Sequence, residues 1–230
     1  MPKICLIALL VLLCPQVSLF AGTKAYPSPQ RFDKEVAKFV AADKEKAPAP
    51  GGILCIGSSS MRKWHPTIAK DLGPLDVIPR GFGGSNMNDV VHFTDQIVLP
   101  YKPRAILLYE GDNDAGQGIS TTVFIAKLGE FIGRVRAELP ECRFYLLPAK
   151  PSIKRWNLWP RMVEANNAVK QLCDSDPYLT YVDVATPMLG PDGKPIPELF
   201  VSDNLHMTPK GYEIWTSVVR PILMANEAKK

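Results

Sequence analysis

The feature that most constrains the fold is a regular alternation of short apolar runs with longer segments of helical periodicity. The apolar runs are residues 53–56, 75–79, 105–109, 143–147 and 180–184. The segments of helical character lie at about 60–72, 85–98, 121–138, 157–175 and 209–225. Short, wholly apolar runs are typical of strands buried on both faces, and a helix is the usual connection between parallel strands. The alternation therefore predicts an α/β protein whose parallel sheet is covered by helices on both faces.

The region before the first strand, residues 26–51, has a different character. It contains a short amphipathic helix marked by apolar residues at helical spacing, Phe32, Val36, Phe39 and Val40, followed by a Lys/Ala/Pro linker over 44–51. A chain of 230 residues has material for one domain, or at most two. We therefore expect three parts: an N-terminal segment 1–25, a helix and linker 26–51, and the main domain 52–230.

The first 25 residues have the composition of a secretory signal peptide. Lys3 precedes an apolar run from Ile4 to Val17, and small residues follow at Ser18, Ala21, Gly22 and Ala25. The run is too short to cross a bilayer comfortably, and no second long apolar segment follows it. We expect cleavage after Ala21 or Ala25, a secreted or periplasmic protein, and no stable membrane insertion once the signal is removed. A buried N-terminal strand or helix is the alternative.

Charge and cysteine content exclude two other classes. The net charge of +4 is mild and no cluster of lysines or arginines concentrates it, so we expect no nucleic-acid partner. Cleavage of the signal would leave Cys55, Cys142 and Cys173, an odd number. We therefore expect no disulfide framework.

Polar residues gather where the predicted strands end and in the last long loop. The serines of Gly57-Ser58-Ser59-Ser60 follow the first strand, and three further segments are Gly81–Asn86, Glu110–Asp114 and Asp203–His206. Ligands of parallel sheets bind at the carboxyl ends of the strands. Together these segments supply a hydroxyl, bare backbone N–H groups, an amide and an Asp/His pair, the set that acyl transfer needs. The alternative for the serines is a helix cap, and spacing does not decide among Ser58, Ser59 and Ser60.

The general base can be chosen by elimination, because the chain has three histidines. His65 lies in the helix after the serines and is expected to point away from the strand end. His92 lies within a helical segment and is expected to be a partly exposed surface residue. His206 lies in a loop, and Asp203 three residues earlier can accept a hydrogen bond from one ring nitrogen while the other faces a nucleophile. We therefore expect His206 to be the base.

Gly84 and Asn113 are candidate donors to an oxyanion. Glycine at 84 allows a backbone N–H to approach a ligand closely, and the Asn113 amide offers a side-chain N–H₂. Plain turn formation explains each of them equally well when it is considered alone.

Other catalytic motifs do not fit the spacing. A nucleophile elbow would need glycine where Met61 stands, and a dinucleotide-binding Gly-x-Gly-x-x-Gly would need it where Asn86 stands. The P-loop signature is absent, and a calcium loop starting at Asp112 would have Gln117 and Val123 in place of its glycine and glutamate. No His-Glu-x-x-His motif and no paired cysteine ligands are present, so we expect no catalytic metal.

The four polar segments, taken together and in this order, resemble the sequence blocks of the SGNH hydrolases, also called GDSL-type esterases/lipases. The Gly-Ser-Ser-Ser start is similar to the branch related to platelet-activating-factor acetylhydrolase. The resemblance implies a flavodoxin-like three-layer α/β/α sandwich with a five-stranded parallel sheet, and an SGNH hydrolase domain over 52–230 that uses no cofactor. It also implies that Ser59 is the nucleophile, that Asp203 and His206 are its partners, and that Ser59, Gly84 and Asn113 form the oxyanion hole. Ser58 departs from the family's aspartate at that position.

The resemblance and the export signal together predict a secreted serine esterase for short-chain, acetyl-type esters, with acetylated carbohydrate as the first substrate class to test. A lysophospholipase or thioesterase with the same site is one alternative, and a non-catalytic carbohydrate-binding protein on a hydrolase scaffold is another. Trp64, Trp156 and Trp159 are candidates for a sugar-stacking rim, with packing in the interior as the alternative. Arg155 is a candidate contact for an anionic group, with a solvated surface charge as the alternative.

Overall fold

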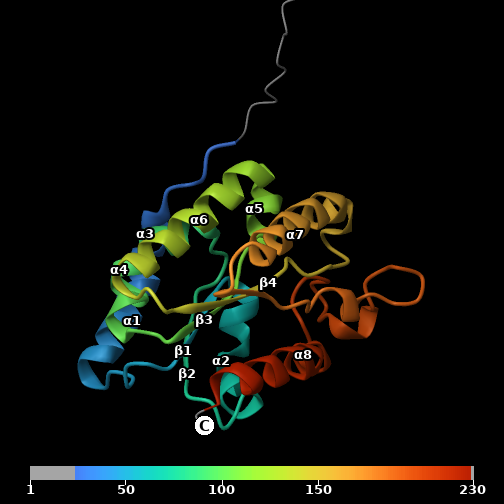
Figure 1. Ribbon diagram of the computed structural model, residues 1–230. Helices are drawn as coiled ribbons and strands as arrows, with labels where there is room; N and C mark the ends of the chain where they lie inside the picture. Colours follow the sequence, from blue (N-terminus) through green and yellow to red (C-terminus); the bar gives the residue numbers. More distant parts are fainter. Residues whose placement is uncertain (1–23, 229–230) are drawn as a thin grey trace, which may run out of the picture.

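Five strands form one parallel sheet in the computed structural model of the chain, which describes residues 24–228 (Figure 1). The strands are β1 (Ile53–Gly57), β2 (Val77–Gly81), β3 (Ala105–Tyr109), β4 (Arg143–Leu147) and β5 (Leu179–Tyr181). Their order across the sheet is β2-β1-β3-β4-β5, and each neighbouring pair is parallel. This is the flavodoxin-like order, so the predicted fold class is confirmed.

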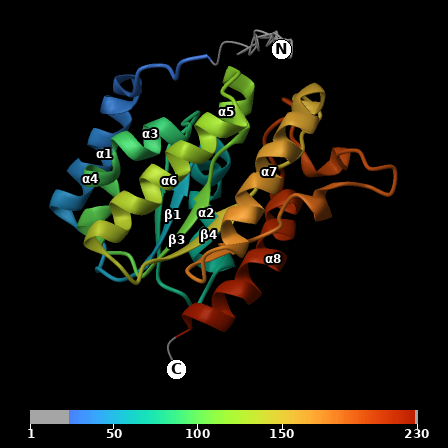
Figure 2. The same cartoon turned by 45° about the horizontal axis from the view of Figure 1, so that its top comes forward.

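Helices cover both faces of the sheet (Figures 1 and 2). One face carries the helices α1 (Asp33–Glu45), α3 (Met87–His92), α4 (Thr94–Ile97), α6 (Thr121–Glu138) and α7 (Trp159–Asp174). The other face carries α2 (Ser59–Asp71) and α8 (Pro209–Glu227). A short helix, α5 (Asp112–Gln117), follows β3. Each face has its own hydrophobic core, and the sheet separates the two.

Successive side chains of a strand point to opposite faces of the sheet, so the inner strands contribute residues to both cores. In β1, Leu54 and Ile56 pack into the core under α1, α3, α4, α6 and α7, while Ile53 and Cys55 pack into the core under α2 and α8. All four side chains are fully buried. A strand buried on both faces must be apolar at every position, which is why the sequence shows continuous apolar runs rather than an alternating pattern.

β2 begins two residues later than the predicted run 75–79, and its position in the sheet explains the difference. The register pairs Val77 with Ile53, so the strand extends through Arg80 and Gly81. Arg80 is only 7% exposed because its guanidinium forms an ion pair with Asp43 at 2.6 Å and donates from Nε to the Tyr101 hydroxyl at 2.6 Å. The neutralising partner comes from a distant helix, so the sequence pattern around Arg80 does not reveal a buried strand residue.

Two helical segments differ from the prediction for local reasons. The segment expected over 85–98 is divided into α3 and α4 at Phe93, where the Thr94 hydroxyl donates to the carbonyl oxygen of Val90 at 2.9 Å. A threonine that bonds to the preceding turn in this way bends a helix. Helix α5 occupies a stretch expected to be a turn, and it begins after Gly111, whose φ of +109° permits the sharp change of direction.

The N-terminal helix α1 packs directly on the main domain. Val36 of α1 is fully buried, and together with Phe32 it belongs to the same core as the sheet residues Leu54 and Ile56. The proposed signal peptide lies outside the described residues, apart from its last two. Within residues 24–228, no helix combines the length and the apolar character needed to cross a membrane.

The far end of α8 is fixed by a buried carboxylate. The Glu227 side chain is fully buried and accepts hydrogen bonds from Arg143 at 2.5 and 2.7 Å and from the Tyr145 hydroxyl at 2.7 Å. Arg104 adds a contact from Nε at 3.2 Å. These partners lie at the start of β3 and in β4, so the end of α8 is tied to the edge of the sheet opposite the carboxyl ends of the strands.

Candidate active site

The polar segments identified in the sequence meet at the carboxyl edge of three adjacent strands. Ser59 follows β1, the segment containing Gly84 follows β2, and Asn113 follows β3. Since β2 and β3 are the two neighbours of β1 in the sheet, these segments flank the serine on either side. The turn after β1 depends on Gly57, because its φ is +140° and a Cβ there would lie 2.1 Å from the carbonyl oxygen of Tyr109.

The structure distinguishes the three consecutive serines. Ser58 is the N-cap residue of α2, but its side chain makes no capping hydrogen bond and is buried. Ser60 is 2% exposed. Ser59 is partly exposed at the first position of α2, and its Oγ lies 2.9 Å from Nε2 of His206. Ser59 therefore has an imidazole partner, and the cap interpretation does not account for its side chain.

Asp203 orients both the ring and the backbone of His206. Its Oδ2 lies 2.6 Å from Nδ1 of the imidazole, while its Oδ1 accepts from the backbone N–H groups of Leu205 at 2.9 Å and His206 at 2.8 Å. The hydrogen bond from His206 is the main reason why the pKa of Asp203 is held below its usual range. Asp203 therefore stays ionised, and the tautomer that donates from Nδ1 to Asp203 leaves Nε2 free to accept from Ser59.

The other two histidines have different environments. Nε2 of His65 accepts a hydrogen bond from the backbone N–H of Gly81 at 2.8 Å. Burial, with the nearby charges of Arg80 and Arg62, lowers the pKa of His65 to about 4, so the ring is neutral at physiological pH. His92 is exposed on α3.

Gly84 has the backbone geometry expected of a close-approach donor. Its φ is +89°, and no atom lies within 4 Å of the position that a Cβ would occupy. The preceding residue, Gly83, donates its backbone N–H to Glu35 Oε1 at 3.2 Å, so α1 helps to hold this loop. The space beside Gly84 is therefore open at the edge of the sheet.

Asn113 is 8% exposed, and its amide is held at both ends. Nδ2 donates to the backbone carbonyl of Ser85 at 2.8 Å, and Oδ1 accepts from Nη2 of Arg155 at 2.9 Å. The Asn113 amide is therefore linked to the loop after β2 and to the segment after β4.

Buried carboxyl groups accept hydrogen bonds next to these loops. Glu110 accepts from the Ser85 hydroxyl at 2.5 Å, and Asp114 accepts from the Tyr26 hydroxyl at 2.7 Å. Burial raises the pKa of Glu110 well above its ordinary value, and the charge of Asp114 adds to that shift. Asp89, which forms an ion pair with Arg31, has its pKa raised to about 6, again mainly by burial.

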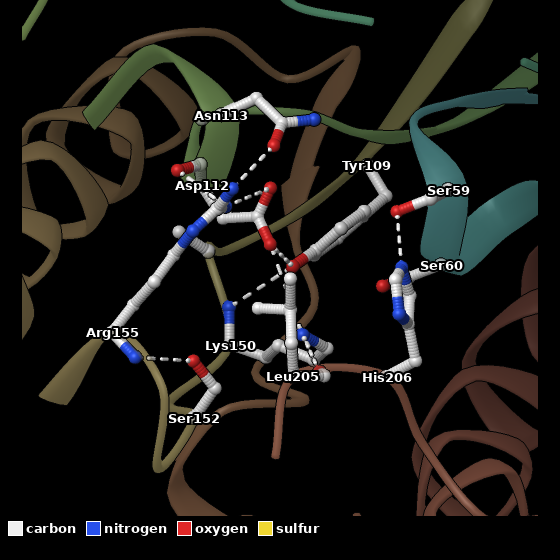
Figure 3. Close-up of polar contacts among 12 residues, drawn as sticks. Ser59, Ser60, Tyr109, Asp112, Asn113, Lys150, Ser152, Arg155, Leu205 and His206 are labelled. Atoms are coloured by element: carbon white, nitrogen blue, oxygen red, sulfur yellow. Dashed lines mark hydrogen bonds and ion pairs between the residues drawn. The ribbon is translucent and has the colours of Figure 1, made fainter. Parts of the chain in front are cut away.

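Sequence reasoning missed a polar network after β4, which Figure 3 shows beside the serine and histidine. Lys150 is 1% exposed, and its Nζ donates to the carbonyl oxygen of Leu205 at 2.9 Å. Asp112 lies between Lys150 and Arg155, with ion-pair distances of 3.7 Å and 3.4 Å. Arg155 is thus engaged within the protein rather than being a solvated charge. The position of this segment at the end of a strand was the available signal.

The tryptophans named as a sugar-stacking rim fall into two groups. Trp64 is fully buried between α2 and α8, where its ring lies 5.7 Å from that of Trp215. The rim interpretation is therefore wrong for Trp64. Trp156 and Trp159 are partly exposed and stack with ring centroids 5.8 Å apart and an interplanar angle of 15°.

The described part of the chain contains no group of three or more His, Cys, Asp or Glu side chains arranged to hold a metal ion. Cys55, Cys142 and Cys173 are all unpaired and buried.

The sequence model of the GDSL-like lipase/acylhydrolase family matches residues 52–214. A search of curated proteins finds no match.

Among solved structures, a candidate platelet activating factor from Streptococcus pneumonia is similar with a TM-score of 0.74 and 18% identity, over 84% of this chain and 93% of that one. A GDSL-like lipase from Bacteroides thetaiotaomicron has a TM-score of 0.68 and 15% identity, over 86% and 98%. A catalytic mutant of an acetylxylan esterase from Geobacillus stearothermophilus has a TM-score of 0.59 and 13% identity, over 74% and 93%.

Proposed function

Because the chain belongs to the GDSL-like lipase/acylhydrolase family, a family of carboxylic ester hydrolases, we propose that it is a secreted serine esterase for short-chain, acetyl-type esters. The observation that carries this proposal is the continuous line from Ser59 Oγ to His206 Nε2 at 2.9 Å and from His206 Nδ1 to Asp203 at 2.6 Å. This is the arrangement in which an imidazole can activate a hydroxyl nucleophile.

In the proposed reaction, His206 takes the proton of Ser59 as the Oγ attacks the ester carbonyl. The C–O bond to the leaving alcohol then breaks as His206 returns the proton to that oxygen, which leaves an acyl-serine. Water, activated by His206 in the same way, releases the acid and restores Ser59. Asp203 remains a carboxylate throughout and stabilises the imidazolium that forms in each half of the cycle.

Three donors are proposed for the oxyanion. The backbone N–H of Ser59 lies in the first turn of α2, where backbone donors have no partner within the helix and the helix dipole favours negative charge. Gly84, where a side chain is absent and φ is +89°, is proposed to contribute a second N–H, and Asn113 is proposed to contribute its Nδ2. Loss of one such donor typically lowers kcat by about 10²–10³.

The surface of the described residues supports a short acyl group. The large apolar side chains exposed in residues 24–228 are Ile153, Tyr178 and Val201, each by 40% or less, which does not amount to a surface for a long hydrocarbon chain. A groove of about 660 Å³ between α2 and α8 is lined by polar and apolar side chains, among them Thr67, Tyr212 and Glu213, and its lining does not include Ser59, Asp203 or His206.

Acetylated carbohydrate is the proposed substrate class. The stacked, partly exposed pair Trp156 and Trp159 offers aromatic surface of the kind that sugars contact. One structure of similar fold is an acetylxylan esterase. The export signal proposed for residues 1–25 would place the enzyme where extracellular polymers are found.

The test compares the wild type with Ser59→Ala on an aryl acetate and on acetylated xylo-oligosaccharide. We expect the variant to lose turnover of both, and we expect an active-site serine phosphonate to label the wild type at Ser59 alone. Full activity of Ser59→Ala would remove the nucleophile assignment. Faster turnover of long-chain acyl esters or thioesters would favour the lysophospholipase or thioesterase alternative, and sugar binding without labelling or turnover would favour a binding protein.

A further inference from the structure

The segment after β4 lies at the carboxyl edge of the sheet, and the proposed mechanism assigns it no role. It is held rigidly, because Asn166 of α7 accepts from the backbone N–H of Ala149 at 2.8 Å and donates to its carbonyl oxygen at 2.9 Å. Six residues later the same segment places Arg155 against Asn113. The segment thus connects the helix layer to the proposed oxyanion donor.

The contacts of Asn113 leave one orientation of its amide. Oδ1 faces the Arg155 guanidinium, which can only donate, and Nδ2 faces the Ser85 carbonyl, which can only accept. Turning the amide by 180° would place its NH₂ group against the guanidinium donors of Arg155 and its oxygen against the carbonyl oxygen of Ser85. Figure 3 shows the oxygen of Asn113 on the side of Arg155 and its nitrogen turned the other way, on the side where Ser59 and His206 lie.

We propose that Arg155 is a positioning residue that fixes the Asn113 amide with its nitrogen toward the oxyanion, an inference that rests on the proposed esterase function. Of the two hydrogens on Nδ2, one is used by Ser85 and the second remains for the substrate. Donors aimed in advance stabilise a developing charge without reorganisation during the reaction, which is where their catalytic effect arises.

Arg155 is itself fixed by the residue before Asn113. Its Nη1 donates to the backbone carbonyl of Asp112 at 2.9 Å and lies 3.4 Å from the Asp112 carboxylate. That carboxylate also accepts from the Tyr109 hydroxyl at 3.0 Å and faces Nζ of Lys150 at 3.7 Å. The guanidinium is therefore held in one place by a buried counter-charge.

The same segment also holds the loop that carries the histidine. Nζ of Lys150 donates to the carbonyl oxygen of Leu205 at 2.9 Å. The backbone N–H of Lys154 donates to the carbonyl oxygen of Asn204, also at 2.9 Å. The segment after β4 therefore contacts both the proposed oxyanion donor and the loop that carries the proposed base. Direct contact between Arg155 and an anionic substrate is the competing role, but the two terminal nitrogens of its guanidinium are already engaged with Asp112 and Asn113.

The experiment is a double-mutant cycle on a neutral aryl acetate, with kcat and KM measured for Arg155→Met, Asn113→Ala and the double variant. We expect Arg155→Met to lower kcat by about 10- to 100-fold, less than the full loss of a donor, with KM changed less than about threefold. In the Asn113→Ala background the same substitution should change kcat less than about twofold, because the group through which Arg155 acts is gone.

Arg161→Met is the matched control. Arg161 is a partly buried arginine in α7 that donates to the carbonyl oxygen of Ile119 at 2.6 Å and has no role in the proposed mechanism. The kcat of Arg161→Met should stay within about twofold of the wild type. If Arg155→Met does not fold, the cycle is run with Arg155→Lys, whose single ammonium group cannot serve Asp112 and Asn113 together. We then expect a loss of at least about threefold that again disappears in the Asn113→Ala background.

Three results would overturn the proposal: a wild-type kcat in Arg155→Met, an equal loss with and without Asn113, or a loss confined to KM for anionic esters. The last would identify Arg155 as a substrate contact instead. Failure of the esterase function is distinguishable, because it would appear first as absent turnover in the wild type or as turnover that survives Ser59→Ala.

Discussion

Replacing Asp203 by asparagine tests the proposed orientation of His206 with little disturbance of the fold. The asparagine oxygen can still accept from the backbone N–H groups of Leu205 and His206, which Asp203 now binds at 2.9 Å and 2.8 Å. Its NH₂ group, however, would face Nδ1 of the ring and donate to it. The ring proton would then sit on Nε2, which could no longer accept the proton of Ser59.

The size of the effect follows from the exposure of the carboxylate. In a site where the aspartate is buried, the same substitution lowers kcat by about 10⁴. Here the Asp203 side chain is 41% exposed, so water can compete with the asparagine amide for Nδ1 and restore part of the productive tautomer. We expect kcat to fall by about 10²–10³, which corresponds to about 3–4 kcal/mol of transition-state stabilisation.

The assay is the initial rate of aryl acetate hydrolysis at saturating substrate, with thermal unfolding as a check on the fold. Asp183→Asn is the matched control, because Asp183 also accepts from two following backbone N–H groups, those of Ala185 and Thr186, and has no part in the proposed mechanism. A kcat within about threefold of the wild type in Asp203→Asn, or a comparable loss in Asp183→Asn, would refute the reasoning.

Three further predictions concern groups away from the serine. Glu227→Ala should lower the free energy of unfolding by about 2–3 kcal/mol in chemical denaturation, below the usual 3–5 kcal/mol for breaking a buried ion pair because its arginine partners can be rehydrated. Glu110→Gln should flatten the pH dependence of stability above about pH 5. Burial raises the pKa of Glu110, so the folded wild type retains a proton that the unfolded chain releases, and wild-type stability falls as pH rises above the pKa of the unfolded chain, as denaturation curves at several pH values will reveal. The thiols of Cys55, Cys142 and Cys173 should resist a thiol reagent at pH 8 until the protein unfolds, because burial raises the pKa of Cys142 to about 12 and of Cys173 to about 11; mass mapping of labelled peptides measures this.

The fold was predictable because the apolar runs of the inner strands report burial directly. β3 and β4 occupy the predicted residues, 105–109 and 143–147, and both have a helix layer on each face. Prediction failed where a distant partner changes what a residue can do. Arg80 continues β2 only because Asp43 and Tyr101 neutralise it, and a helical pattern around Phe93 cannot report the hydrogen bond that bends it.

The site was predictable to the extent that its residues stand in short segments at strand ends. The sequence pointed to Ser59, His206 and Asp203, and the structure brings their side chains into contact. Arg155 could be named as a charge but not as a partner of Asn113, because that pairing depends on two loops separated by a strand and a helix. Trp64 was assigned to a possible rim because local sequence does not distinguish a tryptophan facing solvent from one facing a core.

Helix α8 links two distant parts of the domain: the loop that carries His206 lies just before its first turn, and Glu227 lies in its last turn. The contact between His206 Nε2 and Ser59 Oγ joins residues 147 positions apart in the chain. Because the proposed nucleophile follows the first strand and the proposed base follows the last, the catalytic set is complete only in the folded domain.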